Sequence, residues 1–242
     1  MLTLLKKRQA RNAAKIAHET RCEDESLVSN EPLLEALIPS SDDPLAGKPW
    51  DEVQRILAVD LEFVRTLAGF EEKNAFRKEL IKKYKGQVAH LLATHKNLDG
   101  IDLVWWYYLW QIDCGLLPLV HDAFKAAVMR GLSTPKQWNT NGQTAYCDLI
   151  FKYSHKAHTE KTPFNSLYLT KAIADIAEGK IAINAPLKVK MFRLAGDWFD
   201  EGGNKKEALA LFEIVMQIDP NKGGRKKRVK ELKEEFAHGQ DQ

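Results

Sequence analysis

The chain has 242 residues, of which 44% are hydrophobic and 29% charged, a composition typical of a folded globular protein rather than a disordered one. Its three cysteines are irregularly spaced, which excludes a disulfide framework or a zinc knuckle and favours a reducing compartment. No apolar run approaches the roughly 20 residues that cross a bilayer, and lysines interrupt the N-terminus too early for a secretory signal. We therefore expect a soluble intracellular protein without a membrane partner.

Charged residues are arranged in blocks, although the net charge of +3 is too small to indicate a partner by itself. Residues 1–21 are basic and residues 22–72 are mainly acidic, and two further basic blocks lie at residues 73–85 and 222–230. A basic helix can follow the phosphate backbone of DNA. The alternatives are a solvated helix face or pairing between blocks of opposite sign, and the charge pattern alone leaves these alternatives open.

The N-terminal quarter of the chain is predicted to contain little packed structure. Residues 1–25 are expected to form a basic amphipathic helix, with an organellar presequence as the alternative for this Arg-rich, acid-poor start. Residues 26–49 read as an acidic linker rich in proline and serine. Prolines interrupt this linker too often for a long helix, although the apolar patch at residues 33–38 allows about two helical turns.

Residues 50–96 carry apolar side chains at helical spacing, with an interruption at Gly69 and Phe70. This segment is either a helical hairpin or one long bent helix, and the hairpin is favoured. Its narrow apolar stripe with charged flanks suits coiled-coil-like self-association. The alternative is a helix pair that packs on the protein's own core. We assign the hairpin to oligomerisation.

Residues 97–242 are expected to form a tetratricopeptide-like helical domain, because the pattern there is one of short helices in pairs. Asn184 is predicted to cap one of these helices, with Pro186 in its first turn. No run of alternating strands occurs, so the fold class is all-α. The predicted helices span residues 103–113, 117–130, 143–158, 163–178, 184–201, 204–218 and 224–237.

An internal repeat appears when the chain is shifted by 88 residues. Leu103 then falls on Met191, Trp106 on Leu194, Trp110 on Trp198, Gly115 on Gly203 and Phe124 on Phe212. The second copy resembles a tetratricopeptide hairpin, in which small residues permit close helix crossing and an aromatic ring fills the groove. The period differs from the usual ~34 residues, so we expect a hairpin pair inside a helical array rather than a regular solenoid, with tryptophans in the core.

No pattern identifies a catalytic residue, a metal site or a cofactor site. A phosphate-binding Gly-x-x-x-x-Gly-Lys-Ser/Thr loop is absent from the sequence. His155 and His158 could share a helix face, but cysteines or clustered carboxylates to complete a metal site are lacking. Asp175, Glu178 and Lys180 resemble an acidic-plus-lysine nuclease signature, yet that chemistry commonly uses carboxylates on adjoining strands, and these residues lie at a predicted helix end.

The order of these parts resembles the small terminase subunit of temperate, contractile-tailed phages. The resemblance covers roughly residues 50–236, and its most telling parts are Leu-Trp-x-x-Asp-x-Gly at 109–115, the helix stop at 131–135 and the Asp-Glu-Gly-Gly-Asn turn at 200–204 followed by Ala208. The resemblance implies a protein that recognises the packaging start on double-stranded viral DNA in the bacterial host cytoplasm. It also implies homo-oligomers, including rings, and delivery of the DNA to a large ATPase subunit.

DNA contact is expected first from the N-terminal basic block, then from the second block, and then from the C-terminal helix. The candidate DNA-binding residues are Lys6, Lys7, Arg8, Arg11, Lys15, Lys78, Lys82, Lys83, Lys85, Arg225, Lys226, Lys227 and Arg228.

Two other functions remain open at this point. One is a tetratricopeptide-like protein-interaction adaptor that is indifferent to DNA. The other is a terminase subunit with its own endonuclease activity, since the family is often labelled an endonuclease subunit, although no residue pattern supplies that chemistry. Whether the chain is an enzyme is therefore left undecided by the sequence.

Overall fold

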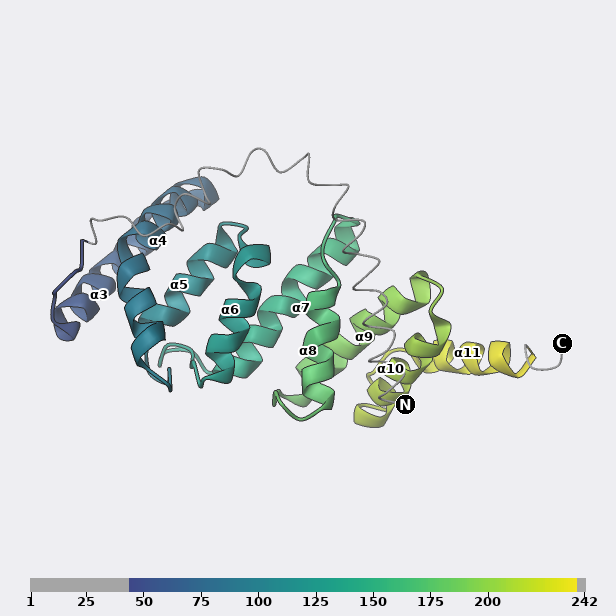
Figure 1. The fold of residues 1–242 in the computed structure, drawn as a ribbon. Coiled ribbons are helices and arrows are strands. Elements are labelled where there is room, and N and C mark those ends of the chain that lie inside the picture. Colours follow the sequence, from purple (N-terminus) through teal and green to yellow (C-terminus); the bar gives the residue numbers. More distant parts are fainter. Residues whose placement is uncertain (1–43, 239–242) are drawn as a thin grey trace, which may run out of the picture.

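The described part of the chain, residues 44–238 of a computed structural model, contains nine α-helices and no strand. The all-α prediction is confirmed, and the helix order is compatible with a tetratricopeptide-like array. Successive helices lie side by side, with α3 at one end and α11 at the other (Figure 1). The helices are α3 (Trp50–Thr66), α4 (Gly69–Thr94), α5 (Asp102–Asp113), α6 (Leu117–Met129), α7 (Gly142–Glu160), α8 (Leu167–Ala177), α9 (Ala185–Glu201), α10 (Lys205–Ile218) and α11 (Lys226–His238).

Helices α3 and α4 form the hairpin that the sequence favours over one bent helix. Extended backbone at Leu67 and Ala68 separates them, and Gly69 begins α4 with a φ of +76°, a conformation that favours glycine. The hairpin packs on the core of the same chain through α4. The buried residues of α4 are Leu80, Ile81, Tyr84, Val88 and Leu91, whereas those of α3 are Val53 and Leu57.

The apolar core continues through the array from Leu45 to Val215. Aromatic rings join its layers, because Tyr84 of α4 lies 5.7 Å from Trp110 of α5 between ring centroids. Phe124 of α6 lies 5.4 Å from Trp105 of α5 and 5.6 Å from Tyr146 of α7. Trp105 and Trp110 are buried, which confirms their prediction as core residues.

The two copies of the internal repeat correspond to the hairpins α5–α6 and α9–α10. Gly115 and Gly203 occupy equivalent turns with φ of +83° and +76°. Phe124 and Phe212 are both buried. In the second copy, α9 crosses α10 closely at Gly196, where an added Cβ atom would lie 2.4 Å from Cε1 of Phe212. The small residue therefore permits the helix crossing that the repeat predicts.

Predicted helix boundaries agree closely with the structure, with one clear exception. The helix expected to begin at Pro163 begins at Leu167, because the side chain of Asn165 accepts a hydrogen bond from the Leu167 backbone N–H at 2.9 Å and forms a turn there. Asn184 caps α9 as predicted and accepts from the Leu187 N–H at 2.9 Å. The predicted helix of residues 1–25 and all but the last residues of the 26–49 linker lie outside the described residues.

We predict that Gly196→Ala lowers the free energy of unfolding by about 1–3 kcal/mol, because the new methyl group must displace the Phe212 ring from a packed crossing. Urea unfolding followed by circular dichroism measures this change. Gly86→Ala is the matched control, since Gly86 is exposed in the middle of α4 and alanine there should be neutral or stabilising by up to about 1 kcal/mol. Equal behaviour of the two variants would contradict the close crossing.

Candidate nucleic-acid interface

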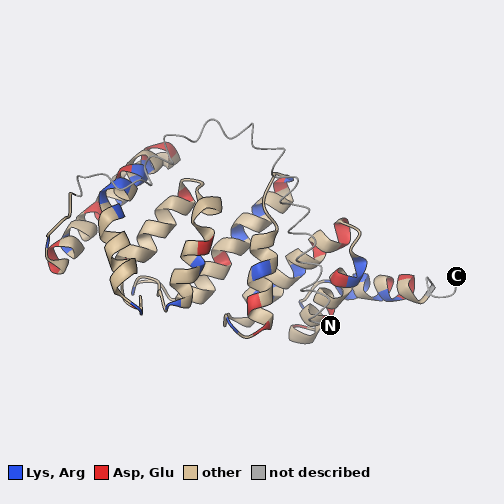
Figure 2. Ribbon diagram, viewed as in Figure 1, with Lys and Arg blue, Asp and Glu red and all other residues tan. Residues whose placement is uncertain are grey.

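Charged residues are concentrated on α4 and at the α9–α11 end of the array, whereas α5 is almost free of charged residues (Figure 2). The second basic block lies along α4. Lys78 and Lys82 of this block are exposed to solvent, and Lys82 makes an ion pair of 3.2 Å with Glu79 one turn before it. Exposed pairs of this kind are weak. Both ammonium groups can therefore turn toward a phosphate.

Lys83 has a different role in the hairpin. Its Nζ atom lies 2.6 Å from Oδ2 of Asp60 on α3, and the same oxygen accepts a hydrogen bond of 2.6 Å from the Tyr84 hydroxyl. Burial and the neighbouring carboxylate raise the pKa of Tyr84, so its hydroxyl remains a donor. Lys83 and Tyr84 thus join α4 to α3. Lys85 is half-buried, and burial lowers its pKa.

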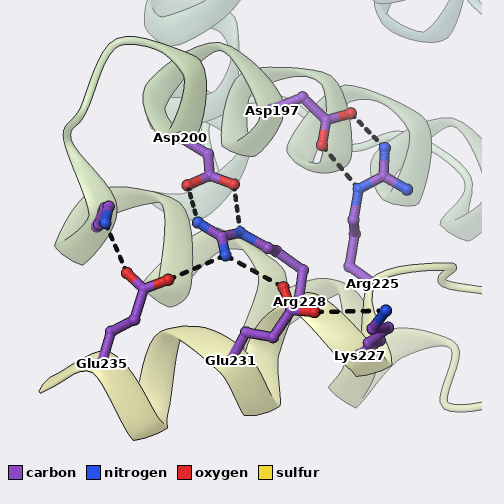
Figure 3. A network of polar contacts seen from close by, with 8 residues as sticks. Asp197, Asp200, Arg225, Lys227, Arg228, Glu231 and Glu235 are labelled. Atoms are coloured by element: carbon purple, nitrogen blue, oxygen red, sulfur yellow. Dashed lines mark hydrogen bonds and ion pairs between the residues drawn. The ribbon is translucent and has the colours of Figure 1, made fainter. Parts of the chain in front are cut away.

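The arginines of the C-terminal basic block bind aspartates of α9 rather than facing solvent (Figure 3). Arg225 donates to both carboxylate oxygens of Asp197, at 2.7 Å from Nε and 2.6 Å from Nη2. Arg228 binds Asp200 in the same way, at 2.6 and 2.7 Å. Its Nη1 atom donates in addition to Glu231 at 3.1 Å and Glu235 at 3.2 Å. These two-point contacts hold α11 against α9.

Pairing favours the charged forms of the residues in this network, because it lowers the pKa of Asp200 and raises that of Arg228. The hydrogen bond from Arg228 holds the pKa of Asp200 below its usual value. A small apolar cluster lies beneath the ion pairs, in which Ala208, Phe212 and Leu232 are buried. The guanidinium of Arg225 also lies 5.9 Å from the centre of the Phe212 ring. Docking of α11 therefore depends on ion pairs as well as on apolar contact.

The lysines of the same block lie on the exposed side of α11. Lys226 and Lys227 are exposed, and the Lys227 side chain keeps 93% of its accessible surface with only a 3.7 Å contact to Glu231. The Lys230 side chain, one turn further on, is 80% exposed. The C-terminal block is thus divided between arginines that bind α9 and lysines that face solvent.

His121 is buried and joins Asp122, whose side chain is exposed, to Tyr146, which is buried. His121 Nδ1 lies 2.8 Å from Asp122 Oδ1, and Nε2 lies 2.9 Å from the Tyr146 hydroxyl. Burial lowers the pKa of His121, which favours its neutral form. The Cys114 thiol does not belong to this group of residues and contacts the backbone carbonyl of Asn74 on α4.

The nuclease-like residues are paired with lysines at the end of α8. Asp175 makes an ion pair with Lys125 of α6, and Glu178 makes one of 2.7 Å with Lys180. Within residues 44–238, no three His, Cys, Asp or Glu side chains are grouped so that they could hold a metal ion. In the same range, no helix is both long and apolar enough to span a membrane. Lys6, Lys7, Arg8, Arg11 and Lys15 lie outside the described residues.

Comparison with known proteins identifies the family. A model of the phage small terminase subunit matches residues 55–184, which is more than half of the chain. The chain belongs to the phage small terminase subunit family. The chain is also 22% identical over 180 residues to the "Terminase, endonuclease subunit" of Escherichia phage P2, across 74% of this chain and 71% of that protein. No solved structure matches it. Membership in the terminase family gives the protein a role in phage DNA packaging.

The matched residues run from α3 to the loop before α9, so the ion pairs between α9 and α11 lie beyond them. No ion pair is predicted from the sequence for Asp197 or Asp200, although a signal for these pairs exists. The two aspartates are spaced i, i+3 on α9, and their partners Arg225 and Arg228 are spaced i, i+3 on the final helical segment. Matching spacings of opposite charge are typical of two facing helices.

We predict that Asp200→Asn lowers the free energy of unfolding by about 1–2 kcal/mol near neutral pH, because it removes a two-point ion pair whose carboxylate is only 19% exposed. The depressed pKa of Asp200 means that this stability is present above the unfolded value of about 3.9 and is lost as the pH falls through the folded value. The difference between variant and wild type should therefore shrink below about pH 4 in urea unfolding.

Glu234→Gln is the control for this measurement, because the Lys230–Glu234 pair is long (3.6 Å) and exposed. This variant should unfold like the wild type. A loss in Asp200→Asn that stays constant across the acid range would contradict an electrostatic origin.

Proposed function

We propose that the protein recognises the packaging start on viral DNA, assembles as a homo-oligomer and hands the DNA to the large ATPase subunit of the terminase. The family match over residues 55–184 carries this proposal. Exposed lysines on α4 and α11 support it, because an ammonium group on a flexible stem can neutralise a phosphate without a fixed geometry. Such contacts position the duplex, and contacts with base edges would then provide recognition.

All three basic blocks remain part of the proposal. Their residues differ in the ion pairs that a phosphate would have to replace. Lys78, Lys82, Lys226 and Lys227 are exposed and make at most long or solvent-facing ion pairs. Arg225, Arg228 and Lys83 hold carboxylates of neighbouring helices. Phosphate binding by these three would require loss of contacts that join helices. We therefore assign the larger share of DNA contact in the described residues to the exposed lysines.

A titration of the purified protein tests this assignment. Labelled duplex carrying the phage packaging start is compared with a scrambled duplex across a salt series. Preferential binding with a steep negative salt slope is expected, and each lost phosphate contact should reduce the slope by about 0.9. Lys226→Ala with Lys227→Ala, or Lys78→Ala with Lys82→Ala, should each reduce the slope by up to about 2. Charge reversal at Lys6, Lys7, Arg8, Arg11 and Lys15 tests the N-terminal block in the same way.

Lys152→Ala with Lys156→Ala is a matched control, since these lysines lie on α7 outside the proposed blocks. This variant should keep the wild-type slope. No binding to either duplex at low salt would reject DNA recognition and leave the protein-interaction adaptor as the better description.

Intrinsic endonuclease activity is a second candidate, favoured by the name of the phage P2 relative, "Terminase, endonuclease subunit". Incubation of the purified protein with duplex and Mg²⁺ tests it directly. Cutting that disappears in Asp175→Asn or Glu178→Gln would support this candidate, whereas intact DNA after prolonged incubation would assign the cut to the large subunit.

A further inference from the structure

The outer face of α3 exposes large apolar side chains, which is unusual at the end of a helical array. Terminal units of stacked helical arrays normally present a polar outer face, since no further unit covers them. Here α3 occupies one end of the array (Figure 1), and the side chains of Val59 and Phe63 are 68% and 48% exposed. Phe70, at the start of α4, is also 68% exposed. Val59 and Phe63 are four residues apart and share one side of α3, so within the described residues they form an exposed apolar stripe of the kind that marks an interaction surface.

The same helix is weakly anchored to its own chain. Only Val53 and Leu57 of its 17 residues are buried, and its contact with α4 is supplemented by the Asp60 ion pair with Lys83. Ile56, Leu61 and Val64 are only partly buried against the core, so α3 gains less stability from packing than α4 does. Phe63 contacts Phe76 of α4, with ring centroids 4.8 Å apart, yet stays 48% exposed, so further burial of Val59 and Phe63 would add stability to α3.

Charges beside these apolar residues alternate along α3. The helix begins with Asp51 and Glu52, and Arg55, Glu62 and Arg65 follow at helical spacing. The side chains of Asp51, Arg55, Glu62 and Arg65 are at least 69% exposed. Their pairs within the helix, Arg55 with Asp51 and Arg65 with Glu62, are therefore weak and can exchange partners.

Two copies of α3 that lie antiparallel to each other would bring opposite charges together. If two copies of α3 pack antiparallel about a point between Ala58 and Val59, Arg55 of each copy lies opposite Glu62 of the other, because residues seven apart share one face of a helix. Parallel packing would place equal charges opposite each other. Ala58 is exposed and small, and beside the two-fold axis it would allow close approach of the two helices. A two-fold interface requires this kind of self-complementarity, whereas an unrelated partner does not.

We infer that the outer face of α3 is a two-fold interface with a second copy of this chain. Val59 and Phe63 form its apolar centre, and reciprocal contacts of Arg55 with Glu62 set its antiparallel direction. The inference rests on the homo-oligomer of the proposed function and identifies the surface that builds it.

Sedimentation velocity over a concentration series of the full chain tests the interface. Arg55→Glu places two pairs of glutamates against each other in every dimer and is expected to weaken association about tenfold. The double swap of Arg55→Glu with Glu62→Arg restores opposite charges and should recover wild-type association. Because residues 55 and 62 make no contact with each other within one chain that could explain recovery, rescue reports a contact between chains.

Phe63→Asp is expected to leave this interface unformed. Leu119→Asp is the matched control, because Leu119 is 52% exposed but lies on α6. This control should associate like the wild type, and thermal unfolding checks that every variant is folded. The interface is overturned if the wild type is monomeric at about 100 μM, where a Kd of about 10 μM would be exceeded. It is also overturned if Phe63→Asp associates normally, or if the double swap behaves no better than Arg55→Glu.

Duplex binding by the same samples separates this inference from the proposed function. Loss of association with retained low-salt binding of duplex supports the α3 interface and leaves DNA recognition intact. Normal duplex binding by a wild type that associates through another face overturns the α3 interface alone. Absence of duplex binding in all variants rejects DNA recognition, and the sedimentation data then still decide the interface.

Discussion

Continuous packing from helix to helix is the constraint on which this structure depends. No hairpin of the array buries its apolar face by itself, and each is covered by the next one, so that a single core extends from Leu45 to Val215. Phe124 illustrates the coupling, since its ring touches aromatic side chains of α5 and α7 at once. Within residues 44–238, this arrangement has two ends, at α3 and at α11. The protein ends its array differently at each: α11 is held to α9 by paired charges, whereas α3 leaves apolar side chains exposed.

The ion pairs at the α11 end change how the basic blocks of the sequence should be interpreted. A run of arginine and lysine residues near position 225 suggests a single surface for DNA, but its members have separate physical roles. Guanidinium groups bind carboxylates at two points, so Arg225 and Arg228 satisfy Asp197 and Asp200 in partly buried positions. The intervening lysines have no such geometry and remain in solvent. Cationic charge that is already neutralised by a partly buried aspartate contributes little to the attraction of a phosphate backbone.

Much of the fold is predictable from sequence because it depends on local patterns. Apolar residues at helical spacing, Asn184 as a cap and Gly69 as a break define helices that the structure confirms. The sequence pattern predicts the start of α8 incorrectly, because the turn at Asn165 depends on one side-chain hydrogen bond. The candidate site is less predictable. Lys227 is exposed, whereas Arg228 beside it binds Asp200 of α9. This difference follows from the position of α9, a helix that is distant in the sequence. Charge counts cannot distinguish the two, although the matched spacing of aspartates and arginines provides a signal once two helices are assumed to face each other.

The family match covers only part of the helical array. It covers residues 55–184, and therefore includes most of α3 and the whole of α4 to α8 but none of the α9–α11 ion pairs. The exposed apolar face of α3 and the exposed lysines of α4 lie within the region that defines the family, next to each other in one hairpin. A face that joins copies and a basic helix beside it would repeat the same phosphate-binding surface in every subunit of an assembly. Repetition raises the effective concentration of weak lysine–phosphate contacts on one duplex, so modest individual contacts can together hold DNA.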